Sequence, residues 1–215
     1  GKQGLNGWIF ALLTLDTMGY KTPEGAEFDR ERILDEIVSS QNTDGGFSLS
    51  KGESDIDITA MALQAIAPYY NDFSRDDVRK SVDKAVEYLS GKQDSSGTFG
   101  SAEADSQVVI ALCSLGIDPE ADSRFVKNAD LFTALLSYQN SDGGFSHEKG
   151  GDSDELATGQ ALCALAAQKR FELTMRRIYD MREELSVLQR EKLDGINGRL
   201  SDISDEESAE KALKL

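Results

Sequence analysis

The chain has 215 residues, of which 39% are hydrophobic and 29% charged, a composition that fits one globular domain with a sizeable core and excludes wholesale disorder. The formal net charge is −16, and a surface of that sign repels nucleic-acid phosphates and anionic lipids. No apolar stretch is long enough to cross a bilayer, so the sequence predicts neither a nucleic-acid partner nor a transmembrane segment.

Two kinds of helix are predicted to alternate along the chain after a first helix over residues 6–18. Apolar residues three and four positions apart predict one helix ahead of each of three similar turns, the last of them over residues 125–138. These residues are Ile33, Ile37 and Val38, then Val82, Val86 and Leu89, then Leu131, Leu135, Leu136 and Tyr138. Helices rich in small residues are predicted after the turns, over residues 57–70, 104–115 and 154–168.

The three turns share one pattern, with QNTDGGF at residues 41–47, QDSSGTF at 93–99 and QNSDGGF at 139–145. The glycines permit a positive φ, the preceding Asp or Ser bonds nearby amides, the Phe fills the core, and the Gln bonds the open end of a neighbouring helix. One helix pair cannot bury its apolar face alone, so successive pairs stack side by side. The predicted structural turn residues are Gln41, Asp44, Gly45, Gly46, Phe47, Gln93, Ser96, Gly97, Phe99, Gln139, Asp142, Gly143, Gly144 and Phe145.

The second helices can be aligned on their leucines. This alignment places Leu63, Leu112 and Leu162 at one repeat position and Thr59 opposite Thr158. It also pairs Cys113 with Cys163, so we expect two matched, buried thiols.

The pattern changes after Phe171, where apolar residues again recur at intervals of three and four: Ile178, Met181, Leu185 and Leu188, then Leu193, Ile196, Leu200 and Ile203. We interpret residues 1–170 as stacked helix pairs and residues 171–215 as a helical hairpin or coiled-coil-like tail. A solvated amphipathic tail and a dimer contact are the two alternatives for its role.

The turns resemble the glutamine–aromatic motifs of squalene–hopene cyclases, with Phe in place of the usual Trp. A narrower resemblance, carried by residues 6–16, 54–70, 104–128 and 154–171, is to the prenyltransferase/squalene-oxidase-repeat domains of secreted or cell-wall proteins of Gram-positive bacteria. It implies an all-α fold, an α/α-toroid, with an extracellular or cell-wall location. About four helix pairs form only a partial ring, so the N-terminal part of the ring is expected to be missing. The exposed inner wall would then be covered by the tail, by a second copy of the chain in a homodimer, or by the missing segment.

Residues 54–61 resemble the protonating motif of class II terpene cyclases, Asp-x-Asp-Asp followed by Thr-Ala. The resemblance implies that Asp57 is the general acid and Asp55 the first acid of the motif, while Ile58 occupies the place of the third. The alternative is that both aspartates cap the following helix. The single histidine, His147, and the two cysteines form no metal-ligand pattern, so no metal and no cofactor are predicted.

We therefore expect a non-catalytic module of a secreted or surface protein that binds an unknown small-molecule or protein ligand. This expectation depends on the missing third acid and on the low aromatic content of 7%, with one tryptophan, because a carbocation needs an aromatic lining. The sequence leans away from catalysis and leaves two alternatives open: an isoprenoid cyclase with Asp57 as general acid, and a structural spacer.

Overall fold

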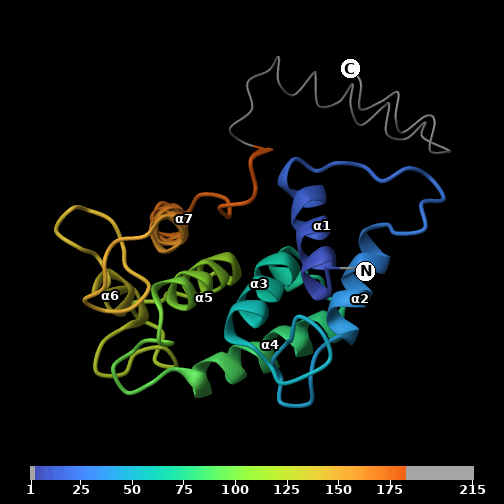
Figure 1. Cartoon of the computed structure of the whole chain (residues 1–215). Coiled ribbons are helices and arrows are strands. Elements are labelled where there is room, and N and C mark those ends of the chain that lie inside the picture. The colour runs from blue at the N-terminus through green and yellow to red at the C-terminus, as the bar shows by residue number, and fades with distance from the viewer. Residues whose placement is uncertain (1–2, 183–215) are drawn as a thin grey trace.

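The computed structural model describes residues 3–182, which form seven α-helices and one short 3-10 helix, with isolated β-bridges and no strands in that range. Four helices form a curved inner row, α1 (Leu5–Thr17), α3 (Ile56–Ile66), α5 (Ala102–Leu115) and α7 (Glu155–Glu172) (Figure 1). The outer layer contains α2 (Arg30–Ser39), α4 (Asp76–Lys92) and α6 (Leu131–Leu136), and the 3-10 helix η1 (Ala67–Tyr69) extends α3. The predicted all-α fold of alternating helices is confirmed.

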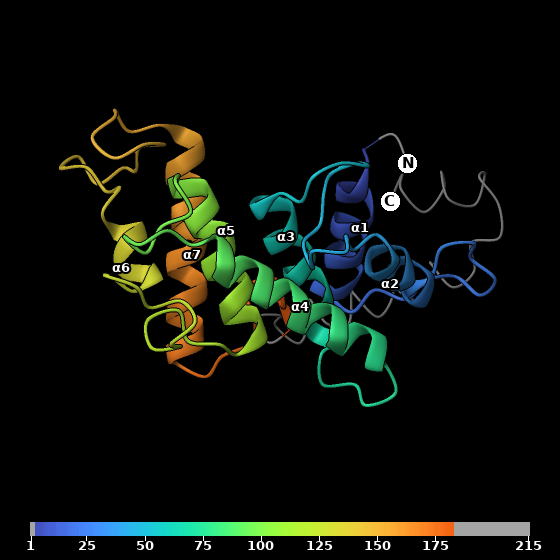
Figure 2. The same ribbon diagram turned by 90° about the horizontal axis from the view of Figure 1, so that it is seen from below.

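Each inner helix packs against the next one along the row, α1 on α3, α3 on α5 and α5 on α7. The outer helices close the other side, with α2 on α1, α4 on α3 and α6 on α5, and Figure 2, seen from below, shows α4 in front of the inner row. The core lies between the two layers. It is filled by fully buried side chains, among them Phe47, Leu63, Leu112 and Phe145.

The two glycines of a turn have different roles. Gly45, Gly97 and Gly143 have φ values of 91°, 95° and 88°, a region that favours glycine. The second glycine is required by close packing instead, because a Cβ on Gly46 would lie 2.4 Å from Cβ of Ser54.

The side chains of the turn bond mostly within the turn itself. Asp44 Oδ1 accepts the Gly46 amide at 3.0 Å, and Gln41 Nε2 donates to the Gly45 carbonyl at 2.8 Å. Gln41 also donates to the Ser81 carbonyl at 2.8 Å, inside α4. The expectation that the Gln bonds an open helix end is therefore wrong. In the second turn Asp94, rather than Ser96, is the acceptor for the backbone amides.

Gly46→Ala is expected to destabilise the protein by about 1–3 kcal/mol, because the new methyl group overpacks against Ser54 and Tyr88. Gly52→Ala is the matched control, since a Cβ there meets nothing within 4 Å. Denaturant unfolding of both variants checks this. Equal midpoints for the two would contradict the packing explanation.

The helix caps define a repeat register that differs from the leucine alignment. Asp55, Ser101 and Asp154 cap α3, α5 and α7. The residue four positions after each cap accepts the amide of the turn Phe: Thr59 from Phe47 at 2.8 Å, Asp105 from Phe99 at 2.6 Å and Thr158 from Phe145 at 2.9 Å. The equivalent of Leu63 in α5 is therefore Val109, three residues before Leu112.

The shifted register separates the two cysteines. Cys113 lies twelve positions after its cap and Cys163 nine, so the predicted match is wrong. Cys113 is half-buried and donates to Gln168 Oε1 at 3.3 Å, whereas Cys163 is exposed. Leu162, which does match Leu63, is 57% exposed, because α7 is the last inner helix of the described range.

The predicted helix over residues 125–138 is also corrected to the six residues of α6. Asp130 caps α6 by accepting the Thr133 amide at 2.7 Å, and Val126 pairs with Asp130 in an isolated bridge. Phe125 is fully buried from the preceding loop. Burial of this Phe therefore does not depend on a helix.

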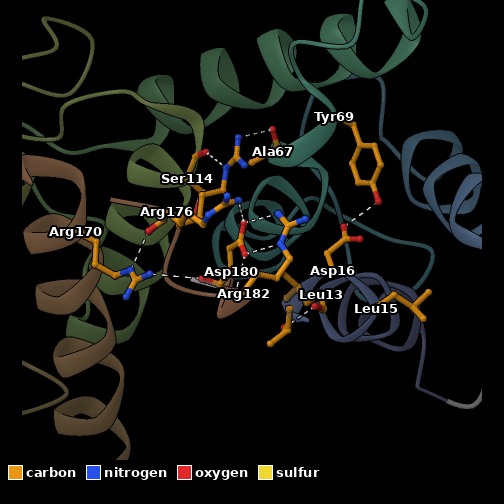
Figure 3. Close-up of polar contacts among 12 residues, drawn as sticks. Leu13, Leu15, Asp16, Ala67, Tyr69, Ser114, Arg170, Arg176, Asp180 and Arg182 are labelled. Atoms are coloured by element: carbon orange, nitrogen blue, oxygen red, sulfur yellow. Dashed lines mark hydrogen bonds and ion pairs between the residues drawn. The ribbon is translucent and has the colours of Figure 1, made fainter. Parts of the chain in front are cut away.

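Residues 173–182, named here the strap, follow α7 and run along the inner row toward α1 (Figure 1). Arg177 donates to the Ser114 carbonyl at 2.6 Å and to the Ala67 carbonyl at 3.3 Å, and the Met181 amide donates to the Thr17 carbonyl at 2.9 Å. These bonds join the C-terminal ends of three inner helices, and Figure 3 shows several of the polar contacts. The helix predicted to start near Ile178 is not formed up to residue 182; the rest of the predicted tail lies outside the described residues.

Candidate active site

Asp55 and Asp57 begin α3 but have different environments. Asp55 is exposed and caps the helix, its Oδ1 accepting the Ile58 amide at 2.9 Å. Asp57 is half-buried, and its Oδ1 is buried with no hydrogen-bond partner in the described part of the chain. The capping explanation therefore accounts for Asp55 and not for Asp57. A buried carboxyl oxygen left unpaired is unusual and points to a functional role.

The surroundings of Asp57 favour its protonated form. Burial raises the pKa of Asp57 from its ordinary value of 3.8 to about 6, with further increases from the negative charges of Asp55 and Glu103 and a partial offset from His147. The raised pKa increases the protonated fraction of Asp57 near neutral pH, and a general acid reacts through that form.

Glu103 and His147 are two members of the site that the sequence analysis did not identify as such. Glu103 lies two positions after the cap of α5, as Asp57 lies two positions after the cap of α3. Its Oε2 lies 2.9 Å from His147 Nδ1. The leucine alignment is three positions out of register, so it did not place Glu103 opposite Asp57. Alignment on the capping residues Asp55 and Ser101, which donors such as the Ala104 amide identify, does place them opposite each other.

A surface hollow of about 490 Å³ gives access to Asp57. Asp55, Asp57, Ile58 and Met61 of the α3 region line one part of it, and residues 48–53 line the rest. Met61 and Asp57 are one helical turn apart, on the face of α3 that its neighbours leave partly uncovered. The hollow is therefore bordered by the Asp57 carboxyl group and by an apolar side chain one helical turn away.

A row of glutamines crosses the inner helices further along. Gln64 Nε2 donates to Gln107 Oε1 at 2.8 Å, and Gln107 Nε2 donates to Gln160 Oε1 at 3.0 Å. The row joins α3, α5 and α7. The inner wall is therefore polar along this row of glutamines, which agrees with the low aromatic content of the chain.

A second cavity, of about 370 Å³, lies between the strap and the C-terminal ends of the inner helices. Its polar groups bond one another or the backbone. Tyr69 donates to Asp16 Oδ2 at 2.8 Å (Figure 3). Arg30 Nε donates to Asp16 Oδ1 at 2.8 Å. Arg177 is held by the helix-end carbonyls described above. This network stabilises the helix ends, so we place the active site at the opposite end of α3.

Asp105 is another buried carboxyl group, but it belongs to a turn. It replaces the threonine of the other repeats and accepts from the Phe99 amide and, at 2.8 Å, from the Thr98 hydroxyl. Burial raises the pKa of Asp105 to about 7, although these hydrogen bonds oppose the increase. The predicted turn residues have a structural role in the three turns and do not come together in one site.

Of the residues that the sequence analysis proposed for catalysis, both Asp55 and Asp57 line the hollow.

A curved double layer of helices with a buried, unpaired carboxyl at the start of an inner helix defines an α/α-toroid protein with a candidate proton donor. The family model of the prenyltransferase alpha-alpha toroid domain matches residues 3–206. The chain therefore belongs to this family, and the predicted α/α-toroid fold is confirmed.

Two individual proteins are similar to the chain. Drimenyl diphosphate synthase from Streptomyces showdoensis is 32% identical over 143 residues, which cover 62% of this chain and 26% of the synthase. The chain thus spans about a quarter of the length of that relative. The solved structure of Candida albicans protein geranylgeranyltransferase-I complexed with GGPP matches with a TM-score of 0.58 at 17% identity, over 94% of this chain and 57% of that chain, and this likeness shows the fold.

These comparisons overturn the prediction of a non-catalytic module, because the curated relative is named as an enzyme, a drimenyl diphosphate synthase. The prediction gave too much weight to the missing third acid at Ile58. In the structure the Oδ1 atom of Asp57 is buried without the third acid, and the charge of Glu103 on the next inner helix adds to the increase in the pKa of Asp57. Within the described residues, no helix is both long and apolar enough to cross a membrane.

Proposed function

We propose that this chain is the acid-bearing part of an isoprenoid cyclase, and that Asp57 protonates a carbon–carbon double bond or an epoxide of a linear isoprenoid. The observation that carries the proposal is the buried, unpaired Oδ1 of Asp57 at the edge of an accessible hollow. The similarity to drimenyl diphosphate synthase supports the same reaction class.

The reaction begins when the Asp57 carboxyl group transfers its proton to one carbon of the double bond. The π electrons form the new C–H bond, and the neighbouring carbon becomes a carbocation, which the next double bond of the chain attacks to close a ring. The last cation then loses a proton to form a double bond, or it takes up water, which releases a proton to leave a hydroxyl group. Asp57, left as a carboxylate, regains a proton from solvent, and its raised pKa favours this step near neutral pH.

We propose prenyl diphosphates as the substrate class, because the similar synthase is named for a diphosphate product. The test is incubation of the protein with linear prenyl diphosphates of increasing length, followed by mass spectrometry of the dephosphorylated products. Cyclic products are expected. A second measurement is a carboxyl-carbon NMR titration of Asp57, expected to give a midpoint near 6. No cyclic product, together with a midpoint at the ordinary value of 3.8, would refute the proposal.

The extracellular or cell-wall location, inferred from the resemblance to Gram-positive repeat domains, stays a prediction. Fractionation of the source cell with an antibody against the chain would test it, and recovery from the cytoplasmic fraction would contradict it.

A further inference from the structure

Asp57 and Glu103 occupy equivalent positions on adjacent inner helices, and their charges interact. Both lie two positions after the capping residue, on adjacent inner helices that pack side by side. Helices of one repeat register present equivalent positions to the same side of the row. Glu103 is only 9% exposed, so its charge is poorly screened from Asp57 by water.

His147 contacts Glu103 from outside the helix row and holds its carboxyl group in place. It follows the third turn in sequence, and its backbone carbonyl accepts the Ala102 amide at 3.2 Å. Its Nδ1 lies 2.9 Å from Glu103 Oε2, while 61% of its side chain is exposed. One residue thus links the third turn to the start of α5 by a backbone and a side-chain contact, and the imidazole stays in exchange with solvent.

We propose that Glu103 is a positioning residue that keeps the proton on Asp57, and that His147 controls how much of the Glu103 charge Asp57 experiences. The inference rests on the proposed function of Asp57 as the general acid. It adds a residue pair, contributed by α5 and by the segment after the third turn, to an acid carried by α3.

The charges around Asp57 determine whether its protonated or its ionised form is favoured. Asp55 and Glu103 favour the protonated carboxyl and His147 opposes it, while Lys51 and Glu53 lie in the loop that lines the hollow. The Glu103 hydrogen bond raises the pKa of His147 above its ordinary 6.5, with smaller increases from Glu148 and Asp154.

Asp57 and His147 interact through their charges, so their titrations are coupled. At low pH the imidazolium offsets the charge of Glu103. As pH rises and His147 loses its proton, the Glu103 charge is no longer offset and holds the proton on Asp57 more strongly. Glu103 thus extends the pH range in which the acid stays protonated, and His147 limits this extension for as long as it is charged.

The test is the carboxyl-carbon NMR titration of Asp57 in three variants of the protein, without substrate. Glu103→Gln is expected to lower the Asp57 midpoint by about half a unit to one unit, since a nearby like charge is lost. His147→Gln is expected to raise it, because a positive charge is lost. Glu155→Gln is the matched control: it removes a carboxylate from the first turn of α7, and the midpoint should not move.

The outcomes separate the inference from the proposed function. If cyclic product forms but Glu103→Gln and His147→Gln leave both the midpoint and the pH–rate profile at wild-type values, the inference is wrong and the proposed function stands. If the midpoint moves as expected but no product forms, the charge coupling is supported and the proposed function fails. His147→Gln alters a mostly exposed side chain, so it reports on the coupling even if Glu103→Gln does not fold.

Discussion

Asp57→Asn is expected to lower the rate of cyclic-product formation by roughly 10²–10⁴-fold, the range that a positioned general acid contributes. Asparagine has nearly the same shape but cannot supply the proton, and the position accepts no hydrogen bond at Oδ1 that the substitution would break. Product formation from a linear prenyl diphosphate, measured at saturating substrate, checks this. The loss should appear in kcat, with the midpoint of thermal unfolding maintained.

Asp105→Asn is the matched control for that experiment. Asp105 is also a buried carboxyl group with a raised pKa, but it is bonded within a turn and does not line the hollow. Turnover should therefore be close to that of the wild type. If Asp57→Asn retains wild-type turnover, the proton comes from another group and the proposed role of Asp57 is wrong.

The same Asp105→Asn variant is expected to change how stability depends on pH. The pKa of Asp105 is about 7 in the folded protein and near 3.8 when unfolded, so the folded state binds more protons between these values. The favourable contribution of Asp105 is thus complete below the unfolded value and is lost as pH rises through the folded one. At about 1.4 kcal/mol per pKa unit, the unfolding free energy of the variant relative to wild type should rise by roughly 2–4 kcal/mol from about pH 4 to about pH 8.

Urea unfolding of both proteins across this pH range measures the change. Asp94→Asn provides a control of opposite sign in the same turn, because hydrogen bonds from Ser96 lower the pKa of Asp94. That variant should lose stability relative to wild type as pH rises through the acid range. Parallel stability curves for wild type and Asp105→Asn would show that Asp105 has no raised pKa.

The helix pairs and their order were predictable because they depend on local information. The spacing of Ile33 and Ile37, or of Val82 and Val86, specifies which helix face is apolar. The glycines of the turns specify where the chain must reverse. Such signals lie within a few residues of one another, so the sequence predicts the inner helices near their observed bounds and a helix ahead of the first turn.

The register between repeats was harder to predict, because two patterns competed. Leucine matching placed Leu112 opposite Leu63. The hydrogen bond from the Phe99 amide to Asp105 matches the one from the Phe47 amide to Thr59, and this register differs from the leucine alignment by three residues. At this repeat position α5 has Asp105 where the other repeats have Thr59 and Thr158. The change of residue type obscures the repeat in the sequence, but the hydrogen bond to the amide of the turn Phe is kept. Only the structure therefore shows that Glu103 is the counterpart of Asp57.

The sequence by itself determined the repeat of helix pairs and the two aspartates at the start of α3, since each depends on residues close together in the chain, whereas the toroid was implied by the family resemblance. The tertiary structure alone decided that Asp55 caps the helix while the Oδ1 atom of Asp57 is buried without a hydrogen-bond partner in the described residues. It also decided that Glu103 and His147 join the site and that the strap binds the helix ends through Arg177. The physical reason is that burial, and the charges that burial strengthens, come from neighbours distant in sequence, which no local pattern records.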